Sequence, residues 1–508
     1  MAKASKTRAS KQAYVSPTQI ILEGFETPFE SNLDAKNRWV QLAHRIPWDS
    51  IVNIYQTQMS NHTTGASNIN PRVVIGSIVI KHMCNLSDEE TILQIQENMY
   101  MQYFIGYSSF SNEVPFDPSL FVEIRKRLGP EQINAINDKI LELSVKKNDS
   151  DKKENDNNDQ NHNQAPQLEN EENTADKKVE IKTHEGRLIV DATACPQDIA
   201  YPTDLNLLND SRIKTEEFID DLFIPSLHGK KKPRTYREEA RIKYVGAAMK
   251  RNKSRKEIRK AIKQQLNYVK RNLNHIENLK RKYSKNKTAL NERQQEYLVV
   301  IKDVYEQQDT MFKTKTHSIE NRIVSIHQPY VRPIKRGKQK AKTEFGAKIQ
   351  VSLVAGYAFL DIISWDAFNE GTKLLLAVEN YKKRTGYYPK EVLADQIYCN
   401  RENRRRLKEL EIRLLAKPLG RRPAVVVEHV RPGERNPIEG KFGQAKTAYG
   451  LNRIKARLSE TSKSWIASII LVLNLVKLAG QVPLSLLQNV FANLFCPRDE
   501  KKYNLLFQ

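Results

Sequence analysis

Apolar residues recur at helical spacing over the first third of the chain. The segment 71–83 starts with a proline, which is favoured at the first position of a helix, and continues as a mostly apolar run. In the segment 86–98, Ser87 is placed as an N-cap and acidic residues fill the first helical turn. These signals predict a helical N-terminal domain over residues 16–146, preceded by a basic arm at residues 1–15.

The pattern changes sharply in the segment 147–180. Asn, Asp, Glu and Gln dominate there, and aromatic residues are absent. Such a composition buries too little apolar surface to offset the entropy of ordering, so it predicts a disordered acidic linker. Two roles are open for it, a plain spacer or a mimic of DNA that shields a basic surface, and the spacer is favoured.

A second helical region is distinguished by its charge. Residues 230–287 contain 22 Lys and Arg against four Glu, which accounts for most of the net charge of +23. Apolar residues recur at three- to four-residue spacing from Ile262 to Ile276, and a second helix over 290–311 is predicted to return beside the first as a hairpin. We assign residues 211–321 to this basic insertion. Its charged face is either solvated or binds the DNA backbone, and the one-sided charge favours DNA.

Strand signals dominate the rest of the second half. Residues 347–355 and 357–364 predict a hairpin around Gly356. With the apolar run before Asp191 and those further along, the order is strand, strand, strand, helix, strand, helix, strand, helix. This order predicts a mixed five-stranded α/β sheet with helices on its faces. The remaining segments follow from it, the sheet domain at 181–210 and 322–480 and a C-terminal tail at 481–508.

Three acidic residues in this half have distinctive settings. Asp191 and Asp395 each end an apolar run, and Glu439 lies where a helix should begin. Carboxylates at strand ends and on a nearby helix can converge on a pair of Mg²⁺ ions, because hard divalent cations bind oxygen ligands. Two ions about 3.5–4 Å apart can activate a nucleophile and stabilise the leaving oxygen of a phosphodiester. The pattern therefore predicts a metal-dependent enzyme acting on nucleic acid, with Mn²⁺ as an alternative metal.

Other acidic residues compete for these positions. Asp198 and Asp204 are weaker candidates than Asp191 for the first position. Glu434 is a rival to Glu439, because it lies near the same helix start. Each could be an ordinary surface acid, but an acid that follows an apolar strand lies at the sheet edge where α/β sites form.

The overall charge and the cysteines narrow the class of protein. A net charge of +23 over 508 residues favours an acidic partner, and nucleic acid is the commonest one. The four cysteines lie far apart with no CxxC pair, which argues against a zinc site or a disulfide framework and suits a reducing cytoplasm. The apolar stretch 465–480 is short and contains Asn474 and Lys477, so it predicts a buried core helix, not a membrane span.

The acidic residues also lie in motifs that resemble those of a known family. Arg435, Glu439 and Lys446 form R-x3-E-x6-K, which is similar to the C-terminal signature of bacterial insertion-sequence transposases of the four/five superfamily. The sequences Asp191-Ala-Thr and Ala394-Asp-Gln-Ile-Tyr resemble their first and second Asp motifs.

Two longer segments extend this resemblance. Residues 39–129 are similar to the N-terminal helical domain of these transposases, and residues 328–338 with 345–348 are similar to a branch with a long insertion. The resemblance covers roughly residues 20–480, and the order and spacing of the motifs make it specific. It implies a ribonuclease-H-like α/β catalytic core with an α-helical N-terminal domain and a basic helical insertion.

The resemblance also implies roles for single residues. Asp191, Asp395 and Glu439 would be the catalytic residues and would hold Mg²⁺ or Mn²⁺. Arg435 would clamp a phosphate unless it forms a helix salt bridge with Glu439, and Lys446 would contact DNA near the cleavage point. Lys348, at the start of a predicted strand near the core, is a third candidate for a DNA contact.

The implied activity is that of a DDE transposase. Such an enzyme would bind the terminal inverted repeats of an insertion sequence, cleave the strand and transfer it into target DNA, as a homodimer or larger assembly on DNA in the cytoplasm. One position departs from the family signature, because Pro432 stands where a Tyr is common; this affects how the helix start contacts DNA, not the metal ligands. The alternatives are an inactive DNA-binding protein derived from a transposase and a metal-dependent nuclease of the same fold.

Overall fold

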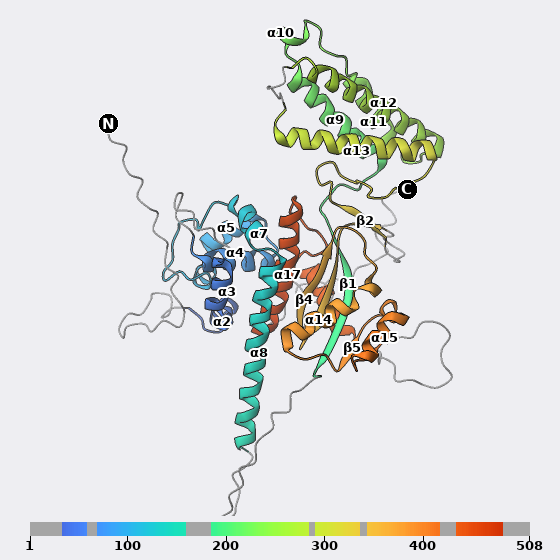
Figure 1. The fold of residues 1–508 in the computed structure, drawn as a ribbon. Helices are drawn as coiled ribbons and strands as arrows, with labels where there is room; N and C mark the ends of the chain where they lie inside the picture. Colours follow the sequence, from blue (N-terminus) through green and yellow to red (C-terminus); the bar gives the residue numbers. More distant parts are fainter. Residues whose placement is uncertain are drawn as a thin grey trace, which may run out of the picture.

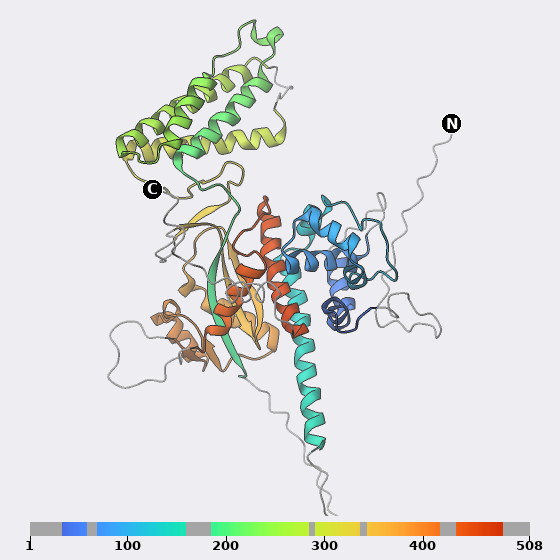
Figure 2. The same ribbon diagram turned by 180° about the vertical axis from the view of Figure 1, so that it is seen from behind.

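In the computed structural model, a central sheet with its own helices lies between the N-terminal helices and a further bundle of helices. Figures 1 and 2 show N-terminal helices on one side of the sheet and a separate bundle of helices beyond one of its ends. The predicted arm at 1–15 and the tail at 481–508 lie outside the described residues. The structure describes residues 33–57, 69–158, 184–283, 290–335, 343–416 and 433–480, and of residues 145–158 the backbone alone.

The N-terminal part is helical, as predicted. Ser87 accepts a hydrogen bond from the amide of Glu90 (3.0 Å), which confirms the predicted N-cap. Trp48 and Phe104 meet edge to face in the buried core of these helices. The helices are α2 (Arg38–Arg45), α3 (Trp48–Gln56), α4 (Pro71–Cys84), α5 (Asp88–Glu97), α6 (Met99–Phe104), α7 (Leu120–Arg127) and α8 (Pro130–Asn158).

Helix α8 is longer than the sequence indicated. Its backbone stays helical to Asn158, inside the segment 147–180 for which the composition predicted a disordered linker. The first turns of α8 are packed in the core, so the polar residues extend an existing helix and need no new nucleus. The rest of that segment lies outside the described residues.

The central sheet is mixed and has six strands, one more than predicted. Strand β1 lies at its centre, antiparallel to β3 and parallel to β5, and β6 is parallel to β5. The additional strand is β2, which is short and contains Pro333, a residue that cannot donate to a strand ladder. The strands are β1 (Arg187–Pro196), β2 (Arg332–Lys335), β3 (Thr343–Val354), β4 (Tyr357–Ser364), β5 (Glu391–Leu393) and β6 (Arg413–Leu415).

The hairpin predicted around Gly356 is confirmed. Strands β3 and β4 pair in antiparallel register from Val354 and Tyr357 outward. The two turn residues, Ala355 and Gly356, have φ angles of 50° and 77°, as a two-residue hairpin turn with left-handed residues requires.

Helices cover the sheet and join it to the N-terminal part. Helix α17 packs on β4, α8 and α4, and Asn474 donates to the side chain of Asn137 (3.0 Å) and to the carbonyl of Ala358 (2.7 Å). Among the described residues α17 is the one helix long and apolar enough to cross a membrane, but 83% of its apolar window is buried in the fold, as predicted for a core helix. The helices are α14 (Leu374–Thr385), α15 (Arg401–Glu409), α16 (Asn436–Ala448) and α17 (Ser459–Ala479).

The helical insertion has a hydrophobic core of its own. Its apolar side chains, among them Leu266, Val269 and Ile276, are buried against each other as the amphipathic pattern predicted. The insertion starts with α9 at Asp204, before the predicted boundary at residue 211, because Leu207 and Leu208 belong to its core. The helices are α9 (Asp204–Leu222), α10 (Pro225–His228), α11 (Arg237–Met249), α12 (Arg255–Lys280) and α13 (Glu292–Thr314).

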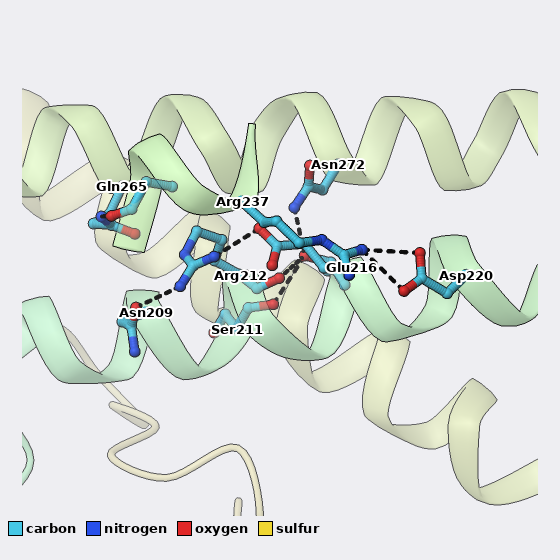
Figure 3. A network of polar contacts seen from close by, with 10 residues as sticks. Asn209, Ser211, Arg212, Glu216, Asp220, Arg237, Gln265 and Asn272 are labelled. Atoms are coloured by element: carbon cyan, nitrogen blue, oxygen red, sulfur yellow. Dashed lines mark hydrogen bonds and ion pairs between the residues drawn. The ribbon is translucent and has the colours of Figure 1, made fainter. Parts of the chain in front are cut away.

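A buried polar network links the helices of the insertion (Figure 3). Arg212 donates to Glu216 (2.7 Å) and to Asn209 (2.9 Å), and only 2% of Arg212 and 6% of Glu216 is exposed. Asn272 of α12 donates to Thr215 of α9 (3.1 Å). These contacts offset the loss of hydration that burial of a charged pair imposes, so the pair stays buried at the helix interface.

Candidate active site

The strand register brings two of the predicted acidic residues side by side. In the parallel pairing of β1 with β5, Leu188 lies opposite Val392 and Ile189 opposite Leu393. Asp191 lies two residues beyond Ile189, and Asp395 two residues beyond Leu393. Asp191 lies inside β1, not at its end as predicted, because β1 continues to pair with β3 as far as Pro196.

Arg435 joins the two aspartates. Its Nη1 lies 3.0 Å from Oδ1 of Asp395, and its Nη2 lies 3.2 Å from Oδ2 of Asp191. Arg435 is the N-cap residue of α16, and its Nε atom is buried without an acceptor among the residues that the structure describes. The alternative that Arg435 pairs with Glu439 is therefore not what the structure has. Instead, one guanidinium neutralises two carboxylates from different strands.

The environment of Asp191 disfavours its negative charge. Burial raises the pKa of this carboxyl above its ordinary value, and the negative charges of Glu370 and Asp395 raise it further. The Ala192 amide, which donates to Asp191 Oδ1 (2.8 Å), and the Arg435 guanidinium lower the pKa of Asp191 only in part. The contact with Arg435 thus offsets part of the cost of burying the Asp191 charge.

Glu439 is not joined to this pair of aspartates. It is in the first turn of α16, one helical turn after Arg435, and its side chain is exposed. Within the described part of the chain Glu439 makes no hydrogen bond or ion pair. In the same part, no three His, Cys, Asp or Glu side chains lie close enough together to hold a metal ion. The predicted metal set thus stays a prediction.

The two predicted lysine contacts differ in their surroundings. Lys446 lies in the last turn of α16 and is half-buried. Lys348 of β3 is mostly buried, and its Nζ donates to the carbonyl of Phe368 (2.8 Å) and pairs with Oε1 of Glu370 (2.8 Å). Lys348 is thus engaged inside the protein, and its contact with DNA stays a prediction.

The rival acidic residues have structural partners. Asp198 pairs with Arg453 (2.9 Å). Asp204 accepts hydrogen bonds from Arg322 (2.6 Å) and Gln308 (2.9 Å) and so ties the first turn of α9 to the end of the insertion. Neither rival takes part in the contact of Arg435 with Asp191 and Asp395, and the choice of Asp191 stays a prediction. Glu434, the rival to Glu439, immediately precedes Arg435.

Glu370 is an acidic neighbour of Asp191 that the sequence analysis did not find. It begins a short 3₁₀ helix, η1 (Glu370–Thr372), between β4 and α14. Its negative charge raises the pKa of Asp191 more than that of Asp395 does. The sequence around Glu370 looks like an ordinary helix start with an acid in the first turn, so no local signal marked it.

The insertion presents a row of positive charges on α12. Lys256, Lys260, Lys263 and Lys270 are all exposed, and their spacing places them along one face of the helix. In the described part of the chain these four lysines have no ion-pair partner. These four charges are therefore available to an anionic partner.

Comparison with known proteins identifies two regions. A family model for a transposase DDE domain matches residues 392–476, which include Asp395, Arg435, Glu439 and Lys446. A second model, for a transposase domain (DUF772), matches residues 27–127. The resemblance to insertion-sequence DDE transposases is thereby confirmed. The two matches lie on the N-terminal helices and on the second half of the sheet domain, and the α9–α13 insertion lies between them.

One relative adds a weaker similarity. The chain is 32% identical over 125 residues to the uncharacterized protein ORF8 in the nfe locus of Rhizobium meliloti. The match covers 23% of this chain and 56% of the relative, so it spans little more than half of the relative's length. No solved structure matches the chain.

Proposed function

We propose that this protein is a DNA transposase that binds the terminal inverted repeats of an insertion sequence and catalyses metal-dependent strand cleavage and strand transfer into target DNA. The observation that carries the proposal is the contact of Arg435 with Asp191 and Asp395. This arginine belongs to the R-x3-E-x6-K signature, and the two aspartates lie on β1 and two residues after its parallel neighbour β5. Three motifs far apart in the sequence thus meet at one point.

The strand order supports a ribonuclease-H-like catalytic core. Without the short β2, the order across the sheet is β4, β3, β1, β5, β6, with β3 antiparallel to both of its long neighbours and β5 and β6 parallel to β1. Asp191 lies on β1, the first strand in the sequence, and Asp395 lies just after β5, which is the fourth when β2 is left out. A ribonuclease-H-like core carries its first two catalytic acids at these places.

The chemistry of the donor set suits Mg²⁺, or Mn²⁺ in its place. Two carboxylates already converge on one cationic group, and hard divalent cations prefer such oxygen ligands. Asp191, Asp395 and Glu439 would hold the ions. When bound, divalent ions would polarise the scissile phosphate and acidify the attacking water or 3′-hydroxyl.

The residues of the chain would then act on DNA directly. Arg435, once its carboxylate partners turn to cations, is free to bind two oxygens of one phosphate with its planar guanidinium. Lys446, about two helical turns after Glu439, would contact the backbone next to the cleaved bond. The row of lysines on α12 would bind phosphates further along the duplex without reading sequence.

Other features of the proposal follow from the family. The N-terminal helical domain would recognise the inverted repeat, and two ends would be held in a homodimer or larger assembly on DNA. The protein would act in the cytoplasm, associated with the nucleoid. The retained pair of aspartates in a shared contact supports an active enzyme over a DNA-binding derivative.

The test is a cleavage and joining assay with Mg²⁺, a duplex carrying the end of the element and a supercoiled target. We expect nicked and joined products from the wild type and none from Asp395→Ala, with equal binding of the end by both proteins. Cleavage without joining would instead identify a nuclease. End binding without cleavage under Mg²⁺ or Mn²⁺ would identify an inactive DNA-binding protein.

A further inference from the structure

A cavity lined by cations lies where the N-terminal helices meet the sheet domain. Its volume is about 330 Å³, and residues of α4, α5 and α7 line one side, while the segment 455–458 and the start of α17 line the other. The two sides belong to the two regions that match transposase domains. The charged residues in the lining are Lys81, Asp88, Arg125, Lys455 and Arg457.

Two of these cations are buried and share one acid. Only 1% of Lys81 and 5% of Arg125 is exposed, and both pair with Asp88. The two Nη atoms of Arg125 donate to the two carboxylate oxygens of Asp88 (2.8 Å each), while its Nε atom is buried without an acceptor among the described residues. The Nζ atom of Lys81 lies 4.6 Å from the centroid of the Trp465 ring, which offsets part of its charge. One carboxylate thus balances two buried cations.

Two further cations line the cavity from the sheet domain. Lys455 and Arg457 are exposed, and they alternate with the buried residues Ile454 and Ala456, a pattern typical of an extended segment. Such alternation places Lys455 and Arg457 on the same side of the segment. In the part of the chain that the structure describes, neither of them forms an ion pair. Both charges are therefore available to a ligand in the cavity.

This segment is fixed to the end of β1. The amide of Ile454 donates to the carbonyl of Pro196 (2.9 Å), and the amide of Asp198 donates to the carbonyl of Ile454 (2.9 Å). Strand β1 also carries Asp191, five residues before Pro196. A ligand held by the segment 455–458 would therefore be tied to the strand of the candidate active site.

The charge in the cavity favours an anion. Its lining contains four cations and one carboxylate, and like charges held close together destabilise each other unless an anion lies between them. Burial lowers the pKa of Lys81 to about 8, and the positive charges of Arg125 and Lys455 lower it further, against the effect of Asp88. Helix α17 also begins at this cavity, with no side chain capping its N-terminus, and such an end attracts negative charge.

On the basis of the proposed function, we propose that this cavity binds a phosphate group and that the backbone of the bound DNA end supplies it. Lys455 and Arg457 would donate to the phosphate oxygens, and the buried Lys81 and Arg125 would add positive charge from behind. A purely structural cluster would need only Lys81, Asp88 and Arg125, because Lys455 and Arg457 add repulsion without gaining a partner. A phosphate bound between the two sides would hold the N-terminal helices and β1 in one arrangement.

The experiment measures binding of the element's end to the full-length protein by fluorescence anisotropy, without divalent metal, so that binding does not depend on cleavage. Uncharged methylphosphonates replace the phosphates of the end one position at a time. The test protein is the double variant Lys455→Ala with Arg457→Ala, and both side chains are exposed, so the fold should persist. Arg453→Ala is the matched control, because Arg453 lies in the same segment but is already paired with Asp198.

We expect one position at which the methylphosphonate weakens binding by the wild type and by Arg453→Ala roughly tenfold, as the loss of a charge-assisted hydrogen bond predicts. The same replacement should have little effect on the double variant, which has already lost that contact. A second measurement, thermal unfolding with and without inorganic phosphate, compares the wild type with the double variant and detects binding of free phosphate.

Each outcome separates this inference from the proposed function. Equal sensitivity of the wild type and the double variant at every position, together with normal cleavage by the wild type, would overturn the phosphate site and leave the transposase intact. One position that affects only the wild type and the control, with no cleavage by the wild type in Mg²⁺, would support the site and reject the transposase. Stabilisation of the wild type alone by inorganic phosphate, with no such position, would overturn DNA as the source. A wild type that does not bind the end would overturn both proposals.

Discussion

Two arginines in this protein each hold acidic residues, but in opposite ways. In the insertion, Arg212 pairs with Glu216 one helical turn away, and both side chains are buried. In the sheet domain, Arg435 pairs with Asp191, which is 244 residues away in the sequence, and with Asp395, which is 54% exposed. The first contact stabilises one helix interface. The second draws distant strands and a helix together at the surface, where a ligand can replace it.

The difference shows in how each acid is balanced. Burial raises the pKa of Glu216, Arg212 and then Arg237 lower it, and Asp220 raises it slightly. Burial also raises the pKa of Asp191, but two further acids add to that effect. Two arginines and one acid thus act on Glu216 in the structural pair, whereas one arginine and two acids act on Asp191 in the candidate site.

The largest expected effect is a loss of DNA cleavage without a loss of stability when the Asp191 carboxylate is neutralised. Asp191→Asn is expected to lower DNA cleavage by roughly 10³-fold, because one carboxylate no longer balances charge at the reacting phosphate. The free energy of unfolding should not fall, because the fold disfavours the Asp191 charge. Urea unfolding beside a cleavage assay measures both, and a variant that cleaves normally or unfolds more easily would contradict the comparison.

Breaking the buried pair of the insertion should have the reverse effect. Arg212→Met leaves Glu216 buried without a partner, so we expect a loss of about 3–5 kcal/mol in unfolding free energy. The double variant Arg212→Met with Glu216→Leu should recover much of this loss, because neither charge remains. Chemical denaturation of all three proteins tests this. Equal stability of the wild type and Arg212→Met would mean that the pair does not hold the bundle.

A smaller loss of stability is expected where η1 packs against the segment after Asp395, at the close approach of Gly371 to Ile397. Gly371→Ala forces a Cβ against the carbonyl of Ile397, and we expect a loss of about 1–3 kcal/mol. Gly443→Ala is the matched control, since a Cβ there meets nothing within 4 Å on α16 and should stabilise the helix by about 0.5–1 kcal/mol. Thermal unfolding should move in opposite directions for the two variants. The same direction in both would reject the close packing at Gly371.

The row on α12 should affect binding and leave chemistry alone. Lys260→Ala and Lys263→Ala are each expected to reduce the slope of log affinity against log salt by about 0.9, because each removes one phosphate contact. Lys313→Ala, whose charge is already paired with Asp309, should change the slope less. Binding measured over a range of salt concentrations decides this. An unchanged slope in the α12 variants would mean that DNA does not follow this face.

Local patterns predicted most of the elements. The N-cap at Ser87, the hairpin at Gly356 and the amphipathic face of α12 all follow from residues within one or two turns of each other. Strand β2 and the last part of β1 were missed, because their pairing with β3 depends on residues far away in the sequence.

In the candidate site, too, the features set by local sequence could be predicted and those set by distant contacts could not. That Asp191 and Asp395 lie side by side could be predicted, because each follows an apolar run and parallel neighbours bring such residues together. The partner of Arg435 could not be chosen, since Glu439 is closer in sequence and the aspartates are closer in space. Glu370 had no signal at all, because its place depends on the fit of Gly371 against Ile397.

The two ends of the helical insertion meet at a single residue of the sheet. Pro196, where β1 ends, and Arg332, where β2 begins, both lie opposite Gly346 on either side of β3. Two strands that flank a third are about 10 Å apart, which roughly three or four residues can span. The helices between these two strands have a core of their own and are thus attached to the sheet at one place. A chain in which a short loop replaces residues 197–331 would keep the sheet continuous, and a different module could be grafted at the same point.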